Sequence, residues 1–161
     1  AQLEPGDSFA VARIDSGSFS ETDIIAKVTF DHRPSRANEQ KRIFSATISK
    51  FIETVQSSAY TDISGGLLLA KEYLNEIGSD KKYIMIFSDM QEELPKGYKR
   101  DFELNLPDYE VIALNVTKLR SDNQDPTQYM QRLKDWQQRV EQSGGKWRMI
   151  NDLEREESLG L

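Results

Sequence analysis

The chain has 161 residues and a formal net charge of −6, which suits one domain large enough to bury its own core. It contains no cysteine, which excludes disulfides and thiolate chemistry. Its basic residues are scattered, whereas phosphate binding needs a concentrated basic surface, and this argues against nucleic acid as a partner. No apolar run reaches the length of a membrane span, and no signal peptide is visible. The composition and the short irregular loops are typical of a bacterial protein, and the compartment stays open.

The N-terminal part of the chain is predicted to form a β-hairpin followed by a long helix. Residues 8–15 and 24–30 read as strands on either side of a polar loop. A helix is expected from Asn38, acting as its N-cap, to about Ser57. Its apolar residues recur at helical spacing and are predicted to form one buried face: Ile43, Phe44, Ile48, Phe51, Ile52 and Val55.

The middle of the chain is organised around one buried strand. Residues 60–66 are small and oxygen-bearing and are predicted to form a loop before a helix that starts at Leu67. Residues 83–87 are apolar throughout, as in a strand that is buried on both faces of a parallel sheet. The run stops at Ser88 and Asp89, and ligands of open α/β sheets bind beyond the carboxyl ends of the strands. Asp89 is therefore either a site residue or a cap for the turn that follows.

The C-terminal part adds another strand, a helix and a last short strand. Residues 109–117 are predicted to form a second buried parallel strand, and residues 146–150 a short last strand. Between them, Asp125 and Pro126 begin a helix in which Gln128 completes a capping-box pattern. Its inner stripe is predicted to be Met130, Leu133, Trp136 and Val140.

The order of these elements predicts the α/β class. We expect a doubly wound, mostly parallel, Rossmann-like sheet with one antiparallel hairpin at its edge and helices on both faces. Residues 1–153 are predicted to form a single domain, and residues 154–161 a charged tail that frays.

Two motifs in this order resemble a known family. Residues 61–67, Thr-Asp-Ile-Ser-Gly-Gly-Leu, precede a helix, and residues 86–90, Ile-Phe-Ser-Asp-Met, end the buried strand. Together they resemble the second and third segments of a von Willebrand factor A-like (vWA) domain, over most of the chain. The resemblance implies a metal-ion-dependent adhesion site (MIDAS) with Thr61 and Asp89 as ligands of Mg²⁺, Mn²⁺ or Ca²⁺. Asp62 and Ser88 are secondary candidates, and each could instead cap or support its own loop.

The resemblance also implies a segment that this sequence does not contain. A vWA domain would begin with a strand carrying Asp-x-Ser-x-Ser and then a helix, ahead of the hairpin. Residues 15–18, Asp-Ser-Gly-Ser, do not match, because Ile14 stands two positions before Ser16, and they are predicted to be a hairpin loop. With two ligands, an ion would bind this chain alone weakly and stay largely hydrated. Without the strand, we expect an unpaired sheet edge that favours self-association.

We therefore predict a non-enzymatic domain that recognises a protein partner, whose acidic residue could complete the metal coordination. Two alternatives stay open. One is a metal-free assembly scaffold with a degenerate site. The other is a metal-dependent hydrolase or phosphoryl-transfer enzyme, but the sequence lacks a Gly-rich phosphate loop, a nucleophile motif and a histidine near the site.

Overall fold

A computed structural model describes residues 4–14, 23–54, 59–78, 80–114, 116 and 119–151. These residues form three α-helices, five strands and one 3₁₀ turn. The chain divides into two compact units. The first contains Ala1–Leu69 and Glu93–Tyr98, and the second contains Ala70–Glu92 and Lys99–Leu161. In the described ranges, no helix combines the length and the apolar character needed to cross a membrane.

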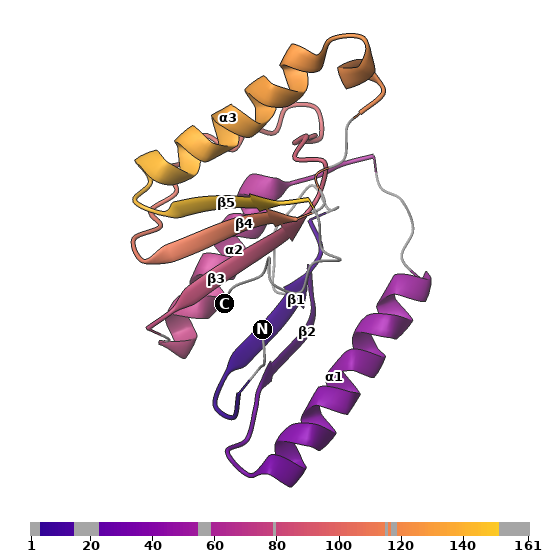
Figure 1. Cartoon of the computed structure of the whole chain (residues 1–161), viewed down its shortest axis with the longest axis vertical. Helices are drawn as coiled ribbons and strands as arrows, with labels where there is room; N and C mark the ends of the chain where they lie inside the picture. Colours follow the sequence, from indigo (N-terminus) through magenta and orange to yellow (C-terminus); the bar gives the residue numbers. More distant parts are fainter. Residues whose placement is uncertain are drawn as a thin grey trace. The chain divides into compact units, whose positions relative to one another are not determined.

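The first unit contains the predicted hairpin (Figure 1). Strand β1 (Ser8–Ala12) pairs with β2 (Ile24–Thr29) in antiparallel register, from Ser8 opposite Thr29 to Ala12 opposite Ile24. The Ser8 and Thr29 hydroxyls lie 2.8 Å apart and hydrogen bond across the open end. The antiparallel pairing is thus confirmed. The predicted loop at residues 15–18 lies outside the described residues.

Helix α1 (Pro34–Thr54) begins earlier than predicted. Asn38 is not its N-cap, because the carbonyl of Arg33 already accepts the first helical bond, from the N–H of Ala37. Pro34 then occupies the first helical position, where its missing N–H is harmless and its fixed φ suits the helix.

One side of α1 packs against the hairpin. The rings of Phe9 and Phe44 meet edge to face, with centroids 5.6 Å apart, and the Gln40 side chain donates to the Thr29 carbonyl. The predicted apolar face is nevertheless too wide, because Ile43 and Ile52 are exposed. Val55 lies outside the described residues.

The parallel sheet belongs to the second unit. Strands β3 (Lys82–Phe87), β4 (Tyr109–Leu114) and β5 (Lys146–Ile150) are mutually parallel in the order β3-β4-β5 (Figure 1). The parallel pairing of the three strands is confirmed, but β3 is not buried on both faces as predicted, because Tyr83 and Phe87 are exposed on one face. The central strand is the most buried, and an apolar cluster crosses the sheet from it: Ile112, Leu114, Ile150 and, packed against them, Met85.

Helix α3 (Pro126–Gln142) begins as predicted. The Asp125 carboxylate accepts the N–H of Thr127, although Gln128 reaches the carboxylate rather than the backbone N–H of a capping box. The buried stripe contains Tyr129 where Met130 was predicted, and Met130 is 64% exposed. Tyr129 fits because it lies at helical spacing from the rest of the stripe, Leu133, Trp136 and Val140.

The described residues therefore form a mixed α/β fold with two sheets. The predicted single sheet with the hairpin at its edge is corrected, because β1 and β2 pair with each other and form a sheet of their own within the described ranges. The charged tail falls outside the residues that the structure describes.

Candidate functional site

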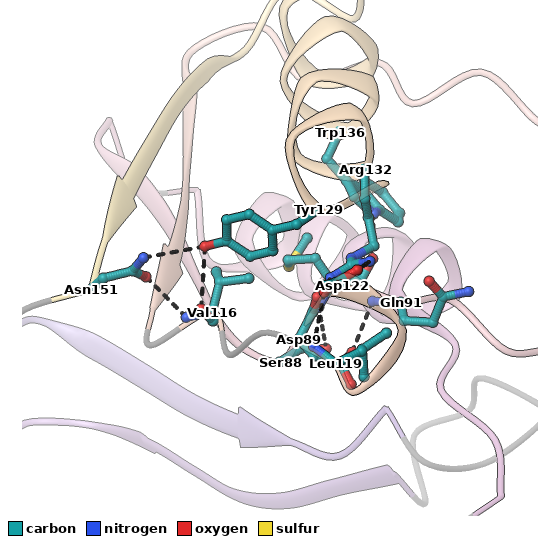
Figure 2. A network of polar contacts seen from close by, with 11 residues as sticks. Ser88, Asp89, Gln91, Val116, Leu119, Asp122, Tyr129, Arg132, Trp136 and Asn151 are labelled. Carbon is teal, nitrogen blue, oxygen red and sulfur yellow. Dashed lines mark hydrogen bonds and ion pairs between the residues drawn. The ribbon is translucent and has the colours of Figure 1, made fainter. Parts of the chain in front are cut away.

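The loop that follows β3 is built from two side-chain turns (Figure 2). The Ser88 hydroxyl accepts the N–H of Met90 at 3.0 Å, and one carboxylate oxygen of Asp89, Oδ1, accepts the N–H of Gln91 at 2.8 Å. Such turns mimic a backbone turn and are typical of Ser and Asp. Met90 is fully buried with φ of +62°, a conformation that non-glycine residues rarely adopt. Ser88 thus supports this loop by hydrogen bonding, as the sequence analysis allowed.

Helix α3 holds this loop in place through two side chains (Figure 2). The Arg132 Nε–H donates to the Asp89 carbonyl at 3.0 Å, and the Trp136 indole N–H donates to the Met90 carbonyl at 2.9 Å. Both donors lie one helical turn apart on the inner side of α3. The backbone that follows the Asp89 side chain is therefore fixed by packed residues.

Arg132 is itself held by a buried ion pair. Its two terminal nitrogens meet the two carboxylate oxygens of Asp122 at 2.7 and 3.2 Å. Asp122 lies in the 3₁₀ turn Ser121–Asn123, and its carboxylate also accepts the N–H of Leu119 at 2.8 Å. Sequence reasoning missed this pair. The available signal was an arginine four residues before Trp136, next to the apolar stripe.

The ends of β4 and β5 are joined by a second small network. The Tyr129 hydroxyl donates to the Val116 carbonyl at 3.3 Å, and the Asn151 side chain accepts the N–H of Val116 at 3.0 Å. The carboxyl edge of the parallel sheet is thus polar and ordered. Beside it lies a shallow depression of about 620 Å³, lined by residues of the β3 loop and α3: Met90, Gln91, Glu92, Thr127, Gln128, Gln131, Arg132, Asp135 and Trp136.

Thr61 belongs to the first unit, and its backbone is fixed by Glu93. The N–H of Thr61 donates to the Glu93 carbonyl at 2.8 Å, and the N–H of Glu93 donates back at 2.9 Å. Within the described residues, no hydrogen bond is made by the Thr61 hydroxyl. Thr61 as a whole is half-buried.

Asp62 is the N-cap of helix α2 (Ile63–Ile77). Its carboxylate accepts the N–H of Gly65 at 2.8 Å, and its side chain is buried. A Cβ on Gly65 would lie 2.5 Å from that carboxylate, so a larger residue there would force the Asp62 side chain to shift. Gly66 is constrained in the same way by Ile14. The helix therefore starts before Leu67, where the sequence predicted it to start.

The predicted ligands stand as follows. Thr61 lies in the first unit and Asp89 in the second. That the two side chains bind the same metal ion stays a prediction. No set of three or more His, Cys, Asp or Glu side chains in the described part of the chain is grouped to hold a metal ion. Comparisons with protein-family models, curated proteins and solved structures found no match. The vWA resemblance thus rests on the residues quoted above.

Proposed function

We propose that this chain is a vWA-like, non-enzymatic protein-binding domain in which Thr61 and Asp89 supply ligands to a divalent cation, with Mg²⁺ as the first candidate. The proposal includes a doubly wound fold in which the carboxyl edge of the parallel strands is the functional edge. The order of hairpin, α1, α2, β3, β4, α3 and β5 supports it.

The observation that carries the proposal is which oxygens of four side chains, those of Thr61, Asp62, Ser88 and Asp89, are already used in hydrogen bonds. Asp62 and Ser88 are engaged in capping and turn hydrogen bonds. Asp89 uses only Oδ1 for its turn, so Oδ2 makes no hydrogen bond to the described residues, and neither does the Thr61 hydroxyl. A hard cation such as Mg²⁺ prefers these oxygens and keeps several waters.

The charge of the chain gives the cation a role in recognition. At a net charge of −6, the chain repels an acidic partner in solution. A hydrated cation at the site has exchangeable positions that a partner's carboxylate could fill, and it removes the local like-charge repulsion. The cation therefore makes an acidic side chain the favoured ligand of this edge.

The test is calorimetric titration of the full chain with Mg²⁺ and Mn²⁺. Asp89→Asn keeps an acceptor for the Gln91 N–H but loses the charge, and Thr61→Ala removes the free hydroxyl. The matched control is Asp101→Asn, in an exposed loop. We expect weak saturable binding by the unmodified chain and the control, and none by the two site variants. Binding that survives both site substitutions, or no binding by the unmodified chain, would contradict the metal site and favour the scaffold.

A further inference from the structure

Strand β3 is an edge strand with little protection. Among the described residues it pairs only with β4, in regular register from Lys82 opposite Tyr109 to Phe87 opposite Leu114. An edge presents unpaired N–H and C=O groups, which proteins usually blunt with charges, proline or bulges. β3 has a single charge, at its first residue, and no proline or bulge.

The opposite edge of the same sheet is different. β5 carries Lys146, which is exposed, and Arg148, which pairs with Glu110 on β4 at 3.0 Å. Two basic residues in a five-residue strand are the charges that protect an edge. β3 instead presents Phe87, which is 67% exposed, and Tyr83, which is exposed on the same face.

The sequence of β3 is self-complementary in one register. In an antiparallel pair, residues directly opposite each other point to the same face, so two copies of β3 can pair only in registers that keep each face together. With Met85 opposite its own copy, Tyr83 lies opposite Phe87 on one face. Ile84 then lies opposite Ile86 on the other face, and Lys82 lies opposite Ser88, with no like charges facing each other.

Shifting this register by two residues in either direction removes the Tyr83–Phe87 match and leaves one isoleucine pair. One shift places Lys82 opposite Ile86, and the other places Tyr83 opposite Asp89. Aromatic pairs and β-branched pairs are the cross-strand contacts that stabilise a sheet. We propose that β3 is a self-association edge, where two copies of this chain pair antiparallel about a two-fold axis at Met85 and extend the parallel sheet across both copies.

The absence of cysteine allows a clean test by disulfide formation. In the proposed register, Cys at position 85 faces its own copy with Cα atoms about 5 Å apart, within the range of a disulfide. In the same register, position 87 faces position 83 of the other copy. The two cysteines of Phe87→Cys would therefore lie four residues apart along the strand direction, about 13 Å, which is too far for a disulfide. We expect Met85→Cys to cross-link under mild oxidation and Phe87→Cys, at the more exposed position, to do so far more slowly. Equal rates would overturn the register.

Sedimentation velocity of the unmodified chain over a wide concentration range tests the association itself. Phe87→Lys removes both aromatic pairs of the dimer, and we expect it to weaken self-association about tenfold. Met130→Lys is the matched control, because Met130 is similarly exposed at 64% but lies on α3. The proposal is overturned if the unmodified chain stays monomeric over the whole concentration range. It is also overturned if Phe87→Lys and Met130→Lys weaken self-association equally. EDTA should change neither result, which separates this edge from the metal site.

Discussion

The buried Asp122–Arg132 pair gives the sharpest prediction of stability. The two side chains are 0% and 11% exposed, and they form a bidentate ion pair. Arg132→Met leaves the buried Asp122 carboxylate without its guanidinium partner, and it also deprives the Asp89 carbonyl of its donor. Breaking a buried pair on one side costs about 3–5 kcal/mol. Since domains are stable by about 5–15 kcal/mol, this is a large share of the free energy of unfolding.

The exposed pair Asp31–Arg33 is the matched control. It is also bidentate, at 2.9 and 2.7 Å, but its arginine side chain is 64% exposed. Water and salt screen such a pair, so we expect Arg33→Met to change stability little. The measurement is urea unfolding followed by far-UV circular dichroism, for the single variants Arg132→Met, Arg33→Met and Asp122→Asn and for the double variant that combines Asp122→Asn with Arg132→Met.

The double variant separates pairing from packing. It removes both buried charges together, so we expect it to recover about 2–3 kcal/mol of the loss expected from the two single variants. The reasoning fails if Arg132→Met costs no more than Arg33→Met. It also fails if the effects of Asp122→Asn and Arg132→Met simply add, because the two side chains would then not be energetically coupled.

Three further predictions concern single contacts. Gly65→Ala should destabilise the chain by about 1–3 kcal/mol, because the new Cβ clashes with the Asp62 carboxylate, and thermal unfolding should show a smaller loss in an Asp62→Ser background. Trp136→Phe should cost about 1–3 kcal/mol, because the buried Met90 carbonyl loses its donor, and an unchanged urea midpoint would contradict this. Hydrogen bonds from the Thr127 hydroxyl and N–H lower the pKa of Asp125 below its ordinary 3.8, so its cap stabilises α3 above that pH and is lost as the pH falls through the folded pKa. Asp125→Asn should therefore reduce the acid-induced loss of stability, measured by unfolding at neutral and acidic pH.

Much of the fold followed from local patterns. The apolar runs of β3 and β4 predicted parallel strands covered on both faces, which holds for β4, whereas β3 is covered on one face and exposes Tyr83 and Phe87 on the other. Asp125 and Pro126 predicted the start of α3 for a similarly local reason, the chemistry of a helix N-terminus. The start of α2 was missed because Gly65 and Gly66 are ordinarily loop residues. Here they are helical because Asp62 accepts the N–H of Gly65 with its carboxylate and the N–H of Gly66 with its carbonyl, and the close approach of Asp62 and Ile14 favours residues without a Cβ.

The sequence alone determined which side chains carry chemistry and where the buried strands end, because hydrophobic period and cap chemistry are local properties. It placed Thr61 and Asp89 at the ends of predicted elements as the candidate ligands. The tertiary structure decided what each oxygen does: Asp62 caps α2, Ser88 holds a turn, and Oδ2 of Asp89 stays available. It also brought Arg132 and Trp136 onto the β3 loop and left β3 at a sheet edge. These outcomes depend on contacts between residues distant in the chain, which no local pattern records.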